Sequence, residues 1–145
     1  MWQKKIKNTF FDQLDDCFYH LNNPSTVSQP KMIAWNDDLA VLLGLNFNVI
    51  KDGPKLENYF SGNNQIPHSQ PISVAYAGHQ FGHFNPSLGD GRAHLLCEVE
   101  SKEDGLLYDI QLKGSGVSRY SRSGDGRSPL GPCLLYTSPS PRDRG

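Results

Sequence analysis

A glycine-rich tetrapeptide occurs twice in this chain. Gly-Asp-Gly-Arg stands at residues 89–92 and again at residues 124–127, and Lys113 lies between the two copies. Glycine has no Cβ, so its backbone N–H can approach an anion closely, and lysine and arginine add positive charge. These residue types therefore suit the binding of phosphate groups. Asp-Gly is also a favoured turn dipeptide, so two unrelated surface turns are the simpler alternative.

Positive charge gathers in the same part of the chain. Residues 1–112 hold eight lysines and arginines against thirteen aspartates and glutamates, whereas residues 113–134 hold four against one. The four cations are Lys113, Arg119, Arg122 and Arg127. A short, glycine-rich basic segment favours a phosphate ligand over long nucleic acid. The chain also has no basic helix and no basic–aromatic pattern of the kind that RNA-binding modules use.

Histidines and aspartates offer further chemistry. His79 and His83 are spaced as a zinc-binding pair on a helix would be, but Gly78 and Gly82 argue against a helix and no acidic residue separates the two histidines. We expect them to be structural or hydrogen-bonded histidines. Asp90 and Asp125 could act as acids or bases, but an aspartate inside such a turn more often bonds its own backbone. The chain has no Gly-x-Ser-x-Gly motif, and no Cys/His pair that stands out as a nucleophile.

The elements that would position these groups begin with a hairpin over residues 93–113. Two strand-like segments flank Glu103, Asp104 and Gly105. Alternation predicts that the first strand has one apolar face (Ala93, Leu95, Cys97, Val99) and one largely polar face (His94, Leu96, Glu98, Glu100) that points to a cleft or to solvent. The second strand places Leu106, Tyr108, Ile110 and Leu112 on its apolar face. Lys113 then ends that strand on the polar side. An ordinary hairpin with a surface lysine is the alternative.

The rest of the chain is expected to be helical or irregular. Residues 9–21 place Phe10, Leu14, Cys17, Phe18 and Leu21 on one helical stripe, with Thr9 as a candidate N-cap. Residues 36–44 are typical of a short helix capped by Asn36 or Asp37 and stopped by Gly44. Residues 22–30 are expected to form a loop. Residues 52–72 are rich in Gly, Pro, Asn and Ser, and we expect them to be irregular.

Composition indicates one soluble domain. A length of 145 residues with 37% hydrophobic residues supports a modest core. No apolar run approaches the roughly 18 residues of a membrane span, and the basic N-terminus lacks the apolar core of a secretory signal. Three widely spaced cysteines, Cys17, Cys97 and Cys133, fit reduced thiols better than a disulfide framework. We therefore expect a cytoplasmic protein that has no membrane or nucleic-acid partner.

Two longer segments resemble a known family. These are YAGHQFGHFNPSLGDGRAHLL and DIQLKGSGVSRYSRSGDGRSPLGP, supported by NYFSGN nearer the N-terminus. They resemble the selenoprotein O family of kinase-like protein adenylyltransferases over most of residues 30–134. The resemblance implies an α+β fold, namely the N-terminal region of a protein-kinase-like fold with antiparallel hairpins and flanking helices. It also implies ATP bound in a flipped orientation, Mg²⁺, and transfer of AMP to Ser, Thr or Tyr hydroxyls of protein partners.

The same resemblance assigns nucleotide-binding positions. Gly89, Gly91 and Arg92 match the first block of the family pattern, Lys113 matches its nucleotide-binding lysine, and Asp125 and Gly126 match the second block. The catalytic base, the metal ligands and the glutamate that pairs with the lysine belong to a later part of the family pattern. No catalytic residue and no metal ligand is therefore assigned in this chain, which we expect to be inactive alone. A kinase-like phosphotransferase and a non-catalytic nucleotide-binding or interaction domain remain alternatives.

The last residues depart from the family pattern. Cys133–Asp143 read CLLYTSPSPRD, which is also the translation of a DNA sequence that resembles a transposase-type sequencing adapter. We therefore expect residues 1–134 to be the N-terminal part of an adenylyltransferase domain and residues 135–145 to be a non-native tail. A genuine Pro/Ser-rich disordered tail is the alternative. The coding DNA distinguishes the two.

Overall fold

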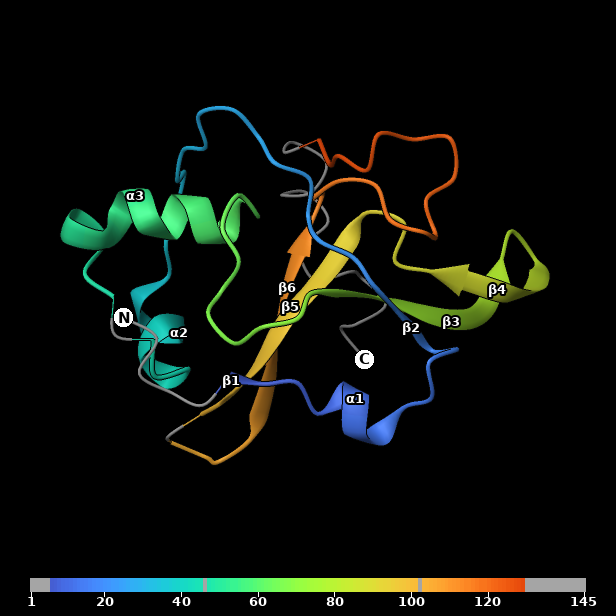
Figure 1. Ribbon diagram of the computed structural model, residues 1–145, viewed down its shortest axis with the longest axis horizontal. Coiled ribbons are helices and arrows are strands. Elements are labelled where there is room, and N and C mark those ends of the chain that lie inside the picture. Colours follow the sequence, from blue (N-terminus) through green and yellow to red (C-terminus); the bar gives the residue numbers. More distant parts are fainter. Residues whose placement is uncertain (1–5, 46, 102, 130–145) are drawn as a thin grey trace, which may run out of the picture.

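A computed structural model describes residues 6–45, 47–101 and 103–129. Within these ranges an antiparallel sheet dominates and short helices lie beside it, so the α+β expectation is confirmed at this level (Figure 1). The elements in chain order are β1 (Ile6–Lys7), α1 (Phe10–Gln13), β2 (Tyr19–Leu21), α2 (Asp37–Leu42), α3 (Val49–Phe60), β3 (Ile72–Gln80), β4 (His83–Gly89), β5 (Ala93–Glu100) and β6 (Leu107–Lys113).

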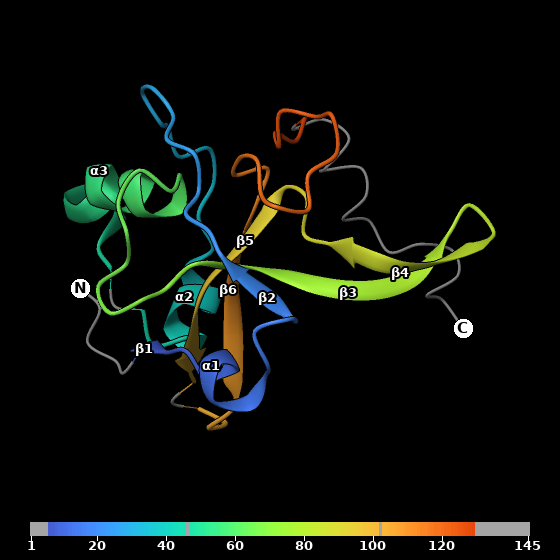
Figure 2. The same cartoon turned by 45° about the vertical axis from the view of Figure 1, so that its right-hand side comes forward.

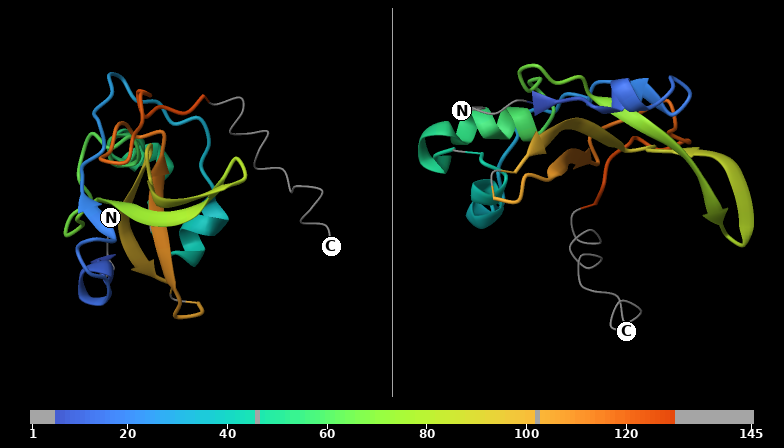
Figure 3. Two further views of the ribbon diagram at one scale, coloured as in Figure 1. Left: turned by 90° about the vertical axis from the view of Figure 1, so that its right-hand side faces the viewer. Right: turned by 90° about the horizontal axis from the view of Figure 1, so that it is seen from below.

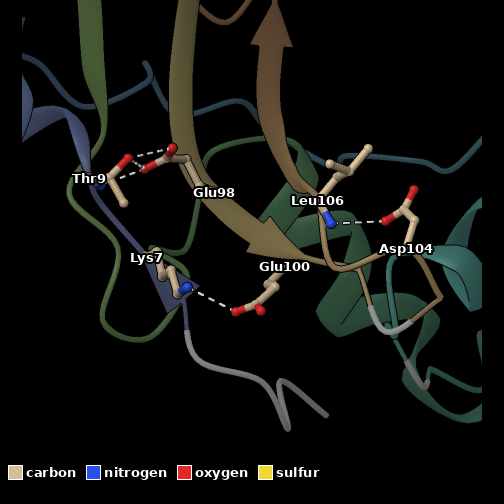
Figure 4. Close-up of polar contacts among 6 residues, drawn as sticks. All are labelled: Lys7, Thr9, Glu98, Glu100, Asp104 and Leu106. Atoms are coloured by element: carbon tan, nitrogen blue, oxygen red, sulfur yellow. Dashed lines mark hydrogen bonds and ion pairs between the residues drawn. The ribbon is translucent and has the colours of Figure 1, made fainter.

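The predicted hairpin is confirmed as β5 and β6. The two strands pair antiparallel from Ala93 opposite Lys113 to Glu100 opposite Leu107. Asp104 stabilises the turn, since its carboxylate accepts hydrogen bonds from the Leu106 N–H at 3.0 Å and from the Tyr108 hydroxyl at 2.7 Å (Figure 4 shows the Leu106 contact). On β6 the apolar face packs inward and the face that ends at Lys113 is exposed, as alternation predicts.

The expectation of a polar, open face on β5 is wrong. His94, Leu96 and Glu98 are buried, with exposed fractions of 0%, 4% and 5%. The reason is that other segments pack over these side chains: Thr9 binds the Glu98 carboxylate, and Asn22 and Ser115 contact the His94 ring. β5 is also the central strand, pairing with β6 on one edge and with β1 and β3 on the other, and its register shifts between Leu95 and Cys97. The core around it comprises Ala40, Leu43, Leu45, Ile66, Leu96, Cys97, Val99 and Ile110.

The helix expected over residues 9–21 is also wrong. Helix α1 ends at Gln13, and Tyr19–Leu21 form a strand that pairs with Ile72–Val74 of β3. Cys17 is exposed, as are Phe18 and Leu21 of the predicted apolar stripe. Thr9 does not cap the helix through its side chain: its N–H and its Oγ1 both donate to the buried Glu98 carboxylate, at 2.5 and 2.7 Å (Figure 4).

The second predicted helix is confirmed, and a third was missed. In α2 the Asn36 side chain accepts a hydrogen bond from the Leu39 N–H at 2.9 Å, and Gly44 follows the helix with φ of 65°. The irregular region expected over residues 52–72 instead begins inside α3, which contains Pro54. Leu56 of α3 is fully buried, so packing outweighs the helix-breaking tendency of Pro54. The predicted loop at residues 22–30 is present.

A long hairpin projects from the body of the sheet. Strands β3 and β4 reach beyond β5 and β6, away from α2 and α3 (Figures 2 and 3). In the described part of the chain, none of the helices has the length and apolar character needed to cross a membrane. The predicted tail at residues 135–145, like Cys133, lies outside the described residues.

Candidate anion-binding cleft

An open cleft of about 1000 Å³ lies where the β3–β4 hairpin, the start of β5, the end of β6 and the loop over residues 119–127 meet. All six residues that the sequence assigned to a nucleotide line this cleft: Gly89, Gly91, Arg92, Lys113, Asp125 and Gly126. Arg119, Arg122 and Arg127 line it as well. The structure thus brings both Gly-Asp-Gly-Arg copies and the intervening lysine to one hollow.

The first copy is held in shape by the loop after Lys113. The Ser118 hydroxyl donates to the Asp90 carbonyl at 2.5 Å, and the Ser121 hydroxyl donates to the Gly91 carbonyl. The Tyr120 ring packs directly on Gly89, where a Cβ would lie 2.3 Å from its nearest ring carbon. Sequence reasoning missed these residues, although Ser-Arg-Tyr-Ser follows closely on Lys113 and offered two hydroxyls beside a glycine turn.

Arg92 and Lys113 lie at the same end of the β5–β6 pair. Ala93 pairs with Lys113, and the carbonyl of Arg92 accepts hydrogen bonds from the Gly114 N–H at 2.7 Å and the Ser115 N–H at 3.4 Å. The backbones that carry Arg92 and Lys113 are therefore tied together. Both side chains are exposed, and neither forms an ion pair with the described residues. They remain available to an anionic ligand.

The second copy serves mainly to close the loop. The Asp125 carboxylate accepts a hydrogen bond from the Arg127 N–H at 2.9 Å, as expected for an aspartate in such a turn. The Arg127 guanidinium donates to the carbonyls of Gly114 at 3.4 Å and Thr26 at 3.3 Å. Gly126 lies against Gly116, whose N–H donates to the Gly126 carbonyl at 3.1 Å. Arg127 is thus engaged by backbone rather than free in the cleft.

Asp90 differs from the expectation for a turn aspartate. Its carboxylate accepts hydrogen bonds from the Val74 N–H and from the Gln111 side chain, both at 3.3 Å, rather than from its own turn. Partial burial raises the pKa of Asp90, and the hydrogen bond from Val74 offsets part of that rise. The pairing of the first turn with β3, which lies 16 residues away, explains the difference.

His79 and His83 lie on strands rather than on a helix. Both are exposed, and the His79 ring packs on Phe84 with centroids 5.4 Å apart. Nowhere in residues 6–45, 47–101 and 103–129 do three His, Cys, Asp or Glu side chains come together in a way that could hold a metal ion. Arg122 reaches the same hairpin, since its guanidinium donates to the Gln80 side chain at 2.8 Å.

The arrangement suits a polyphosphate. Arg92 and Lys113 supply two charges from adjacent strands beside the glycine turn, which the loop at Ser118–Ser121 holds in shape. The neighbouring Arg119 adds positive potential at the rim of the same cleft. Such a site can bind and orient phosphate groups, while the chemistry of bond cleavage needs further groups.

Comparisons with known proteins agree with this geometry. A family model described as protein adenylyltransferase SelO matches residues 3–133. The protein nucleotidyltransferase YdiU of Teredinibacter turnerae is 46% identical over 130 residues, which is 90% of this chain and 26% of that protein. The proteins of the same name from Pseudoalteromonas translucida and Clostridium perfringens are each 49% identical, over 86% and 89% of this chain. The chain spans about a quarter of the length of these relatives.

Proposed function

Because the chain belongs to the SelO family of protein adenylyltransferases, we propose that it supplies the phosphate-binding part of an enzyme that transfers AMP from ATP to protein hydroxyls. The observation that carries the proposal is the meeting of Gly89–Arg92 and Lys113 in one cleft. The relatives' name, protein nucleotidyltransferase, supports a protein substrate. Ser, Thr and Tyr side chains would be the acceptors, in the cytoplasm.

The order of strands and turns along the chain supports the same proposal. The order is strand β4, glycine turn, strand β5, tight turn and strand β6 ending in Lys113. Kinase-type nucleotide sites use a glycine-rich turn over the phosphates and a lysine on the strand that follows the next hairpin turn. We propose on this basis that residues 1–134 form the N-terminal part of a kinase-like domain and that residues 135–145 are not native to it, which the coding DNA tests.

In the proposed mechanism Arg92 and Lys113 hold the terminal phosphates of ATP. This leaves the α-phosphorus exposed to a protein hydroxyl. The hydroxyl oxygen forms a bond to the α-phosphorus as the bond to the β-phosphate bridging oxygen breaks, and pyrophosphate leaves. The chain contributes positioning and charge neutralisation, which suffice for much of the acceleration in phosphoryl-type transfer. The base that accepts the hydroxyl proton is proposed to lie in another part of the enzyme.

Mg²⁺ is the metal implied by the family, and this chain's own donors do not make a complete site for it. Asp90 and Asp125 are the carboxylates of the cleft, and both already accept protein hydrogen bonds. Mg²⁺ commonly uses one or two carboxylates together with substrate phosphates and water. We therefore assign its ligands to residues outside this chain and derive no step through it.

The test uses the complete protein that carries this segment, with ATP labelled at the α- or the γ-phosphate. Transfer of the α-label alone supports the proposal. Transfer of the γ-label would identify a phosphotransferase, and ATP binding with no transfer would identify a non-catalytic domain. We expect Lys113→Ala to weaken ATP binding by roughly 10- to 100-fold, because a hydrogen bond to a charged group contributes about 1.5–3 kcal/mol. Lys55→Ala, an exposed change on α3, is the control and should leave binding unchanged.

A further inference from the structure

A buried histidine connects three segments beneath the cleft. His94 on β5 is fully buried and lies opposite Leu112 of β6. Its Nε2 lies 2.7 Å from the Asn22 side-chain nitrogen, and its Nδ1 lies 2.7 Å from the Ser115 hydroxyl. Asn22 follows β2, and Ser115 stands two residues after Lys113. The imidazole therefore joins the loop that leaves the cleft to a distant part of the chain.

The carbonyls of Val117 and Leu112, at the two ends of this hydrogen-bond network, fix the direction of every hydrogen bond in it. Asn22 Nδ2 also donates to the Val117 carbonyl at 3.1 Å, and the Ser115 hydroxyl donates to the Leu112 carbonyl at 3.1 Å. A carbonyl oxygen can only accept. Asn22 therefore gives its second hydrogen to His94 Nε2, and Nδ1 must carry the proton that reaches Ser115. Only the neutral imidazole satisfies all these contacts.

A protonated imidazole has no place in the network. A hydrogen on Nε2 would face an amide N–H of Asn22. Reversing that amide would place its oxygen against the Val117 carbonyl, so that two acceptors would meet without a donor. Protonation must therefore break the contact between Asn22 and Nε2, or reverse the amide and break the hydrogen bond from Asn22 to the Val117 carbonyl.

We propose that His94 is a positioning residue for the Lys113 end of the cleft, acting in its neutral form through Ser115 and Asn22. The inference rests on the proposed nucleotide site. Its basis is that the loop which His94 holds also holds the cleft: the Gly114 N–H donates to the Arg92 carbonyl at 2.7 Å, and the Ser25 N–H donates to the Ser115 carbonyl at 2.8 Å. Loosening Ser115 loosens the backbone that sets Arg92 beside Lys113.

The surroundings of His94 favour its neutral form, and the charged side chains on neighbouring elements either bind other residues or are exposed. Burial alone lowers the pKa of His94 below its usual value near 6.5. The neutral form is thus favoured in the folded protein, and this contribution to stability is present above pH 6.5 and is lost as pH falls through the lowered pKa. The carboxylate of Glu98 binds Thr9, and that of Asp90 binds Val74 and Gln111. The Arg127 guanidinium binds backbone carbonyls, and Lys113 is exposed.

The first measurement is the protonation state of His94, by nitrogen NMR of this chain between pH 5 and 8. We expect the Nδ1–H form to persist at pH values below the usual histidine pKa of about 6.5. In Asn22→Asp the new carboxylate accepts a hydrogen bond from Nε2–H, so His94 should titrate at a higher pH than in the wild type. A His94 that becomes protonated at or above the usual histidine pKa of about 6.5 in the wild-type chain would overturn the inference.

The second measurement is ATP affinity in the complete protein. At pH 7 we expect Asn22→Asp and Ser115→Ala each to weaken ATP binding about tenfold, in line with the loss of one buried hydrogen bond. The affinity of Asn22→Asp should stay low at pH 8.5, because its carboxylate can donate neither to the neutral Nε2 nor to the Val117 carbonyl. Ser115→Thr, which keeps the hydroxyl, should bind as the wild type does, and a merely structural role does not predict this rescue by threonine. His20→Gln is the control for a histidine outside the cleft.

The outcomes separate this inference from the proposed function. If Asn22→Asp and Ser115→Ala both bind ATP with the wild-type affinity, the positioning role is overturned and the nucleotide site is left intact. A wild-type protein that binds no ATP overturns both. Circular dichroism of each variant identifies any that fail to fold, and the NMR titration of the wild-type chain decides the protonation state without any variant.

Discussion

The two glycines of the second Gly-Asp-Gly-Arg block differ in what an added methyl group would meet. At Gly126 φ is 72°, and a Cβ would lie 2.1 Å from the backbone carbon and oxygen of Gly116. At Gly124 nothing lies within 4 Å of the added atom. Gly126→Ala therefore forces either the left-handed backbone of residue 126 or the loop at Gly116 to move, whereas Gly124→Ala does not.

The expected cost can be worked out from these two effects. An L-residue in the left-handed region costs roughly 1–2 kcal/mol, and inserting a methyl group into a packed site costs about 1–3 kcal/mol. Gly126→Ala should therefore destabilise this loop by about 3 kcal/mol. Gly124→Ala should be neutral or should stabilise the chain by up to about 1 kcal/mol, because alanine reduces the entropy of the unfolded state.

The assay combines urea unfolding with amide hydrogen exchange. The Gly116 N–H, which donates to the Gly126 carbonyl at 3.1 Å, reports directly on the contact. In Gly126→Ala we expect this amide to exchange faster by about two powers of ten even if the loop opens without global unfolding, since about 3 kcal/mol corresponds to that factor. A Gly116 amide that keeps its wild-type protection in Gly126→Ala, or an equal effect of Gly124→Ala, would refute this explanation.

Two further predictions concern titratable groups. Burial, with the nearby carboxylates of Glu98 and Asp109, raises the pKa of Cys97 to about 12. In a Cys133→Ser background, iodoacetamide at pH 8 should therefore modify exposed Cys17 and leave Cys97 unmodified until the chain unfolds. Mass spectrometry of the treated protein measures the modification of each cysteine. Asp90 has a raised pKa, so its charge costs stability above the folded pKa and costs nothing below the usual value of 3.8. Asp90→Asn should accordingly raise the free energy of unfolding at pH 7 but not at pH 3; urea unfolding with equal gains at both pH values would exclude this cause.

Local patterns predicted those elements whose stabilising contacts are local. The β5–β6 hairpin has its turn signal at Asp104 within the turn itself, and α2 carries its own cap at Asn36. The helix predicted over residues 9–21 is wrong because the partners of these residues are distant in sequence. Glu98 binds Thr9 across 89 residues, and β3 pairs with Tyr19–Leu21 across more than 50. A periodic stripe cannot reveal that a strand elsewhere offers better hydrogen bonds.

The same distinction applies to the cleft. Residue type suggested Gly89–Arg92 and Lys113 as candidates for phosphate binding, and the structure places them in one cleft; phosphate binding itself stays a prediction. Ser118 and Tyr120 were missed, since their role depends on the loop folding back over Gly89 and Asp90. The burial of His94 could not be predicted either: alternation placed it on an open face, and the residues that contact its ring, Asn22 and Ser115, lie 72 and 21 residues away in the sequence.

The two Gly-Asp-Gly-Arg copies have the same sequence but make different contacts, and the difference lies in the arginines. Arg127 donates its guanidinium hydrogens to the carbonyls of Gly114 and Thr26, and so holds the loop after Lys113 from one side while His94 holds it from the other through Ser115. Arg92 forms no ion pair with the described residues and is exposed in the cleft. We propose that a ligand phosphate meets Arg92 and Lys113 directly, whereas Arg127, which also lines the cleft, supports the site through the backbone that it fixes. The copies converge on one cleft because the second builds the support on which the first depends.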